Sequence, residues 1–194
     1  MKIKLILTLA FAAACAFTLT CAPFPVAEAQ ENTCGVAELP APIQGLLKNN
    51  FPAMRPKQLS DMGADDQKIW RKAHERDCPG IAVGHFENKD QLAYTIMLVA
   101  KSEPTAGYKV GIFSKAASGD SYAWILLNQV EGHAGQVDSS GLAIFKVPPG
   151  KYSDSLGSKT IHTMLDGVGL EWMKGGADLF YWAGGKYQKL NISE

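Results

Sequence analysis

The chain has 194 residues, no formal net charge and a hydrophobic fraction of 46%, which is enough for one domain with a sizeable core. It contains no basic stripe and no run of like charges. Nucleic acid is therefore not expected as a partner, because its binding depends on neutralising phosphates. An electrostatic membrane patch is not expected either.

Residues 1–29 have the pattern of an export signal. Lys2 and Lys4 give a positive start, Leu5–Ala22 is almost wholly apolar, and Ala27-Glu28-Ala29 fits a small-x-small cleavage site. The pattern predicts a signal peptide over residues 1–29 and one periplasmic or secreted domain over residues 30–194. No later apolar run is long enough to span a bilayer.

Two alternatives to clean cleavage stay open. The apolar run is near the lower length limit for a membrane span, although Pro23 and Pro25 follow it at once. Cys15 or Cys21 could carry a lipid, but neither has a Leu at the third position before it. Lipid or membrane anchoring is therefore the alternative to soluble export.

Two cysteines, Cys34 and Cys78, follow the expected cleavage site. In an exported chain such a pair most simply forms one disulfide. The alternative is a pair of reactive or metal-binding thiols, but the two lack CxxC spacing and have no neighbouring set of histidines.

Two short helices are expected before the strands begin. The first covers Ala41–Asn50, with Pro42 at an early helical position. The second starts at Ser60 or Asp61 and runs to about Arg76, with acidic residues in its first turns and basic residues in its last.

From Ile81 onward the apolar period changes to two, which indicates strands. The expected strands are Ile81–Phe86, Gln91–Lys101, Tyr108–Phe113, Ser121–Asn128, Gly141–Val147, Gly169–Met173, Leu179–Trp182 and Lys186–Ile192. The segment 158–165 fits either a helical turn or a strand. The fold class is therefore α+β, with a mostly antiparallel sheet of roughly six to eight strands and both helices packed on one face.

Two of these strands give more specific expectations. Both alternating faces of Leu92–Ala100 are apolar, so this strand should lie in the middle of the sheet and be covered on both sides. Gly184-Gly185 is a good two-residue hairpin turn and would place Phe180 opposite Lys189.

The string CPGIAVGHFENKDQLAYTIML over residues 78–98 resembles the FG-GAP (VCBS-type) element of integrin-like propellers. Gly84-His85-Phe86 stands at its Gly-Asp-Phe position. The element occurs once, so it does not imply a propeller. It does not imply calcium either, because His85, Glu87 and Lys89 stand where oxygen ligands would be needed.

The chain also resembles small exported bacterial proteins of unassigned function that end in an aromatic hairpin. Four aromatic residues near this end are the candidates for binding a protein, peptide or glycan: Trp172, Phe180, Trp182 and Tyr187. The alternative is that both faces of the hairpin are buried.

The long polar connection Gln129–Gly141 holds the candidates for catalysis. Glu131, His133 and Asp138 could serve acid–base chemistry, and functional residues tend to lie on such loops. No serine-nucleophile elbow or phosphate-binding loop is present, and the four histidines lack metal-ligand spacing, so neither a cofactor nor a metal is expected.

Three functional hypotheses follow. The first is an exported, non-enzymatic binding module, of inhibitor or immunity type by analogy of size and disulfide. The second is a small cell-envelope hydrolase that uses the loop 131–140. The third is a structural envelope protein. The sequence does not specify the partner or the oligomeric state.

Overall fold

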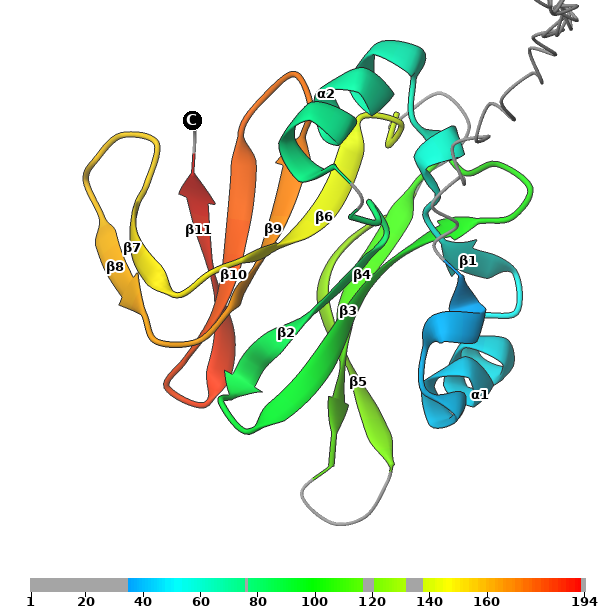
Figure 1. Cartoon of the computed structure of the whole chain (residues 1–194), viewed down its shortest axis with the longest axis horizontal. Helices are drawn as coiled ribbons and strands as arrows, with labels where there is room; N and C mark the ends of the chain where they lie inside the picture. The colour runs from blue at the N-terminus through cyan, green and yellow to red at the C-terminus, as the bar shows by residue number, and fades with distance from the viewer. Residues whose placement is uncertain (1–34, 76, 117–120, 132–137, 193–194) are drawn as a thin grey trace, which may run out of the picture. The chain divides into compact units, whose positions relative to one another are not determined.

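The computed structural model describes residues 35–75, 77–116, 121–131 and 138–192, all within a unit of contacts from Glu31 to Glu194. Two antiparallel sheets pack face to face in this unit (Figure 1). The helical elements are η1 (Val36–Glu38), α1 (Ala41–Asn50), η2 (Leu59–Asp61) and α2 (Ala64–His74). In the described part of the chain, no helix has the length and hydrophobicity to cross a membrane.

The larger sheet contains five strands. They are β1 (Met54–Pro56), β2 (Ile81–Asn88), β3 (Gln91–Ala100), β4 (Tyr108–Lys115) and β5 (Tyr122–Val130). The order is β1-β3-β4-β5, and β2 also pairs with β3. We call this sheet A.

The second sheet, sheet B, has the order β11-β10-β9-β6. Its strands are β6 (Leu142–Val147), β9 (Gly167–Trp172), β10 (Ala177–Ala183) and β11 (Lys186–Ile192). A separate two-stranded ladder joins β7 (Gly150–Ser153) to β8 (Thr160–Thr163).

The expected fold class is confirmed in its coarse form, but the expected strand count was too low. The described residues contain 11 strands in place of roughly six to eight. All eight expected strands are present, and β1, β7 and β8 are additional. These three have only three or four residues each, too few to give a readable alternation. The ambiguous segment 158–165 contains β8, because Thr160–Thr163 pairs with β7.

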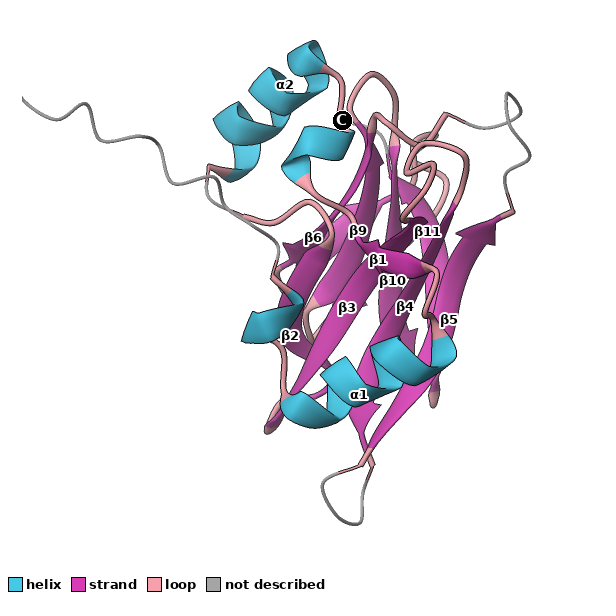
Figure 2. Ribbon diagram, turned by 90° about the vertical axis from the view of Figure 1, so that its right-hand side faces the viewer, coloured by secondary structure: helices cyan, strands magenta, loops and turns pink. Residues whose placement is uncertain are grey.

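The prediction that both helices cover one face was wrong. Helix α1 packs Ile43 and Leu47 on the outer face of sheet A, against Ile96, Leu98 and Phe113. Figure 2 shows α1 lying across these strands. Helix α2 instead packs its buried Trp70 against Ala143 of sheet B and against Met173, which directly follows β9. Each sheet has an apolar outer face, so each needs its own cover. On sheet B the β7–β8 ladder adds to this cover, because Tyr152 and Ile161 pack against the cluster that includes Leu179.

The second helix also begins later than expected. Asp61 ends the short 3₁₀ helix η2, where its carboxylate accepts a hydrogen bond from the Gln58 N–H at 2.7 Å. Gly63 is extended and α2 starts at Ala64. The extended backbone at Met62 and Gly63 therefore separates one expected helix into two elements.

The expectation for Leu92–Ala100 is confirmed except at the start of the strand, where Leu92 is 47% exposed. Thr95 to Val99 of β3 are all buried. Met97 and Val99 face the core between the sheets, together with Ile144 and Val168 of sheet B. The opposite face of β3 is covered by α1.

The expected register of the final hairpin is confirmed as well. Trp182 pairs with Tyr187, and Phe180 pairs with Lys189. Gly184 and Gly185 have φ values of 61° and 80°, which residues with a Cβ rarely adopt.

The Cys34–Cys78 disulfide stays a prediction, because Cys34 lies outside the described residues. We expect protein purified without reductant to resist iodoacetamide at both cysteines and to be alkylated at both after reduction and unfolding. Peptide mass spectrometry measures this. Alkylation of Cys78 in the unreduced, unfolded protein would contradict the pairing.

Candidate functional site

A cleft of about 360 Å³ opens between the two sheets, where β9 turns into β10. Its size lies within the range of roughly 300–1,000 Å³ that is typical of small-molecule sites. Val130 of β5 and Leu142 of β6, which flank the long loop 131–141, both line it. The other described lining residues are Tyr108, Leu170, Trp172, Gly175, Gly176, Ala177, Asp178 and Asn191.

Trp172 gives the cleft an accessible aromatic side chain, with 43% of the residue exposed. Its backbone is fixed in the β9–β10 turn: its N–H donates to the Gly176 carbonyl at 3.2 Å, and its carbonyl accepts from the Gly175 N–H at 2.8 Å. A Cβ on Gly141 would lie 3.4 Å from the indole Nε1, so the indole lies close beside that glycine. The backbone that carries the ring is therefore fixed, and the ring lies beside Gly141.

Asp178 forms the polar wall of the cleft. Its carboxylate accepts from Lys189 Nζ at 2.7 Å and from Asn191 Nδ2 at 3.2 Å. The side-chain oxygen Oδ1 of Asn191 in turn accepts from the Ser155 hydroxyl at 3.1 Å. These contacts orient the carboxylate and balance its charge.

Tyr108 lies on the opposite wall, in β4, and is only 6% exposed. Its hydroxyl accepts a hydrogen bond from Asn128 Nδ2 at 3.4 Å. Burial, with a smaller effect from the Asp178 charge, raises the pKa of the Tyr108 phenol. The phenol therefore stays protonated at neutral pH and can donate a hydrogen bond to a ligand.

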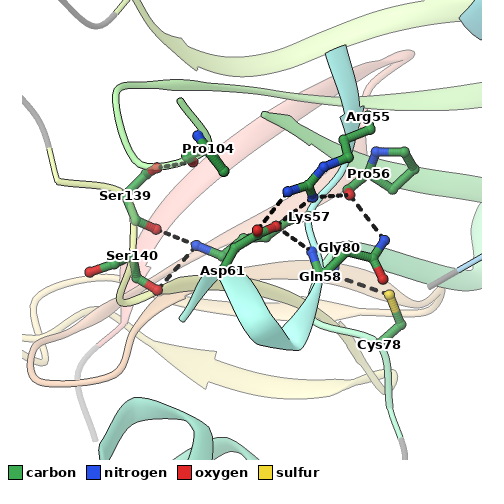
Figure 3. A network of polar contacts seen from close by, with 10 residues as sticks. All are labelled: Arg55, Pro56, Lys57, Gln58, Asp61, Cys78, Gly80, Pro104, Ser139 and Ser140. Atoms are coloured by element: carbon green, nitrogen blue, oxygen red, sulfur yellow. Dashed lines mark hydrogen bonds and ion pairs between the residues drawn. The ribbon is translucent and has the colours of Figure 1, made fainter. Parts of the chain in front are cut away.

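A buried lysine fixes one end of the loop beside the cleft (Figure 3). The ammonium group of Lys57, which is fully buried, donates to the Ser139 carbonyl and to the Ser140 carbonyl, the latter at 3.1 Å. Ser139 is further held by its N–H, which donates to the Thr105 carbonyl at 3.0 Å, and by its hydroxyl, which donates to the Pro104 carbonyl at 3.2 Å. The chain therefore enters β6 from a fixed position.

The segment around Lys57 is itself held by an ion pair. Both terminal nitrogens of the Arg55 guanidinium donate to the Asp61 carboxylate, each at 2.6 Å. This two-bond geometry is the strong form of an Arg–carboxylate contact. Burial, only partly offset by nearby acidic residues, lowers the pKa of Lys57 to about 8.

Of the three expected catalytic residues, Glu131 and Asp138 lie within the described part of the chain. Glu131 is exposed and lies 3.8 Å from Lys109 Nζ. Asp138 is exposed and its carboxylate accepts from the Ser140 N–H at 2.8 Å, a turn-capping contact. His133 lies outside the described residues. Neither carboxylate lines the cleft.

The four aromatic candidates do not form one surface patch. Phe180 is 4% exposed and belongs to the core between the sheets. Tyr187 packs against the same core, and its ring meets Trp182 edge-on at 5.0 Å between ring centroids. Trp172 lies at the other end of β10, in the cleft. Of the four, only Trp172 lines this cleft.

Sequence reasoning missed Lys57, Tyr108, Asp178 and Asn191. A usable indication was present for Asp178, because alternation places it on the same face of β10 as the core residue Phe180. A carboxylate on the inward face of a strand requires a partner or a site. Lys57 follows a proline in a short extended run and carries no comparable indication.

Among the described residues, no group of three or more His, Cys, Asp or Glu side chains is placed to hold a metal ion. The lining of the cleft combines the apolar side chains of Val130, Leu142, Leu170 and Ala177 with a few hydrogen-bonded polar groups and one accessible indole, an arrangement suited to binding. Comparisons of this chain with protein-family models, with curated proteins and with solved structures find no match.

Proposed function

We propose that this protein is an exported, non-enzymatic binding module that holds its partner in the cleft between the two sheets. Export is supported by the basic, apolar and small-x-small pattern of residues 1–29. The observation that carries the binding role is the accessible indole of Trp172, on a backbone held by two hydrogen bonds, beside the carboxylate of Asp178, which is held by Lys189.

The same geometry favours binding over hydrolysis. A hydrolase needs an acid and a base, or a nucleophile and a base, within hydrogen-bond reach of the reacting atoms. Asp178 is the one acidic residue among the described lining, and it is paired with Lys189. A carboxylate held by Lys189 and Asn191 in this way can orient a ligand.

Replacement of the indole gives a direct test. We expect Trp172→Ala to weaken capture of the partner from the cell-envelope fraction by more than tenfold, because aromatic anchors dominate binding energies. Capture on immobilised protein, quantified by mass spectrometry and carbohydrate analysis, measures this. The fold should persist, since Trp172 lies at the surface.

Trp182→Ala is the matched control. It removes the same side chain at the far end of β10, outside the cleft lining, and should leave capture unchanged. Equal recovery of every molecule by the wild type and both variants would count against the cleft as the binding site.

A further inference from the structure

We infer that the cleft recognises a neutral oligosaccharide, whose ring face lies on Trp172 and whose hydroxyl groups bond to Tyr108 and Asp178. The inference rests on the proposed function, because it names the ligand class of the same cleft. It depends on three properties of the lining: an exposed aromatic face, the presence of both hydrogen-bond donors and acceptors, and a carboxylate whose charge is balanced by a lysine.

The aromatic face suits a sugar ring. A pyranose presents C–H groups on one face and hydroxyl groups around its edge, so it gains from contact with an indole without losing hydration of its hydroxyls. The Trp172 backbone is fixed by two hydrogen bonds within the β9–β10 turn, and its ring lies beside Gly141. The backbone therefore need not rearrange for the indole to contact a sugar ring.

The polar groups on the two walls complement hydroxyls, which both donate and accept. An ionised carboxylate has about four lone-pair sites, and Lys189 and Asn191 occupy two of those on Asp178. The remaining sites can accept hydroxyl protons. Tyr108 accepts from Asn128, which leaves its own proton to bond a sugar oxygen.

The charge of the lining favours a neutral ligand. Asp178 is the one charged side chain among the described lining residues, and Lys189 Nζ lies 2.7 Å from it. A cationic ligand would compete with Lys189, and an anionic ligand would be repelled by the carboxylate. An uncharged ligand disturbs neither group.

An extended peptide fits the lining less well. Peptides that lie along strands bond to unpaired backbone groups. At the β9–β10 turn, the N–H groups of Trp172 and Gly175 already donate to the carbonyls of Gly176 and Trp172. These two backbone donors at the turn are therefore not free to pair with a peptide strand.

Calorimetric titration of the purified exported protein tests the inference. The probes are cellotetraose, maltotetraose, mannotetraose and chitotetraose, with tetragalacturonic acid as the charged comparator and an acetylated, amidated Ala-Gly-Ser-Gly peptide as the neutral peptide. We expect at least one neutral sugar to bind and the charged comparator to bind at least tenfold more weakly.

Variants assign this binding to the cleft. Trp172→Ala should weaken it by more than tenfold, and Tyr108→Phe, which keeps the ring and removes the hydroxyl, by about tenfold. Trp182→Ala should bind as the wild type does. Circular dichroism verifies that each variant is folded.

The outcomes separate this inference from the proposed function. Binding of the peptide but of no neutral sugar, lost in Trp172→Ala, would overturn the oligosaccharide and keep the binding module. Absence of binding by every probe, together with Trp172-dependent capture from the envelope fraction, would have the same meaning. Absence of both binding and capture would overturn both proposals.

Discussion

Gly80→Ala is expected to lower the free energy of unfolding by about 4 kcal/mol or more, because the new atom would meet backbone that cannot rotate away. A Cβ at residue 80 would lie 2.2 Å from the carbonyl oxygen of Lys57 and 2.6 Å from its nitrogen. The Lys57 N–H donates to the Met97 carbonyl, and the Met97 N–H donates to the Gly80 carbonyl, each at 2.9 Å. The substitution therefore forces apart three backbone segments.

Urea-induced unfolding, followed by tryptophan fluorescence, measures this loss. Gly45→Ala is the matched control, because residue 45 is an exposed position of α1 with open space around a Cβ. That variant should gain up to about 1 kcal/mol from higher helix propensity. A Gly80→Ala protein with a wild-type midpoint would show that Lys57 and Gly80 are not in close contact.

As the pH rises, the free energy of unfolding of the wild type is expected to increase relative to that of Lys57→Met, by about 3 kcal/mol in total. Burial lowers the pKa of Lys57 from 10.5 to about 8 in the folded protein. Between these two values the unfolded chain binds more protons at this residue than the folded chain does. The linkage relation then makes the wild-type free energy of unfolding rise with pH across this window.

The variant lacks this rise. At pH 7 it loses the donors to Ser139 and Ser140, but it also avoids burying a charge, so the two effects partly cancel. At pH 10 only the loss of hydrogen bonds remains. Denaturant unfolding of both proteins from pH 7 to 10 measures the difference.

The buried tyrosines do not obscure this comparison. The raised pKa values of Tyr108 and Tyr187 make stability fall above pH 10, because the unfolded chain loses those protons first. Both proteins carry these tyrosines, so the difference between them isolates Lys57. A constant difference from pH 7 to 10 would contradict a buried, charged Lys57.

Much of the chain's local structure could be predicted from the sequence. Alternation located all eight of the expected strands, and the diglycine turn gave the register that pairs Phe180 with Lys189. The doubly apolar β3 was correctly placed between two covers. These features depend on neighbours in sequence, where backbone period and turn geometry decide the outcome.

The division of the strands into two sheets could not be predicted. The alternation of apolar residues shows that a strand has a buried face, but not which distant strand packs against that face. A single sheet and two packed sheets are therefore consistent with the same sequence pattern. Helix α2 was assigned to the wrong surface for this reason.

The site failed to emerge for a related reason. Its polar side chains come from three different strands, β4, β10 and β11. They are too far apart in the sequence to form a recognisable motif. Trp172 was selected for its place in an aromatic cluster, although its role in the cleft depends on the neighbouring Gly141 and Gly175.

The two helices pack on different sheets, and this affects which substitutions the protein can tolerate. A substitution that weakens the packing of α1 exposes Ile96 and Phe113 on the outer face of sheet A to solvent. The core between the two sheets stays buried. A change in α2 acts in the same way on Ala143 of sheet B. Each outer layer can thus drift during evolution without reshaping the interior on which ligand recognition would depend.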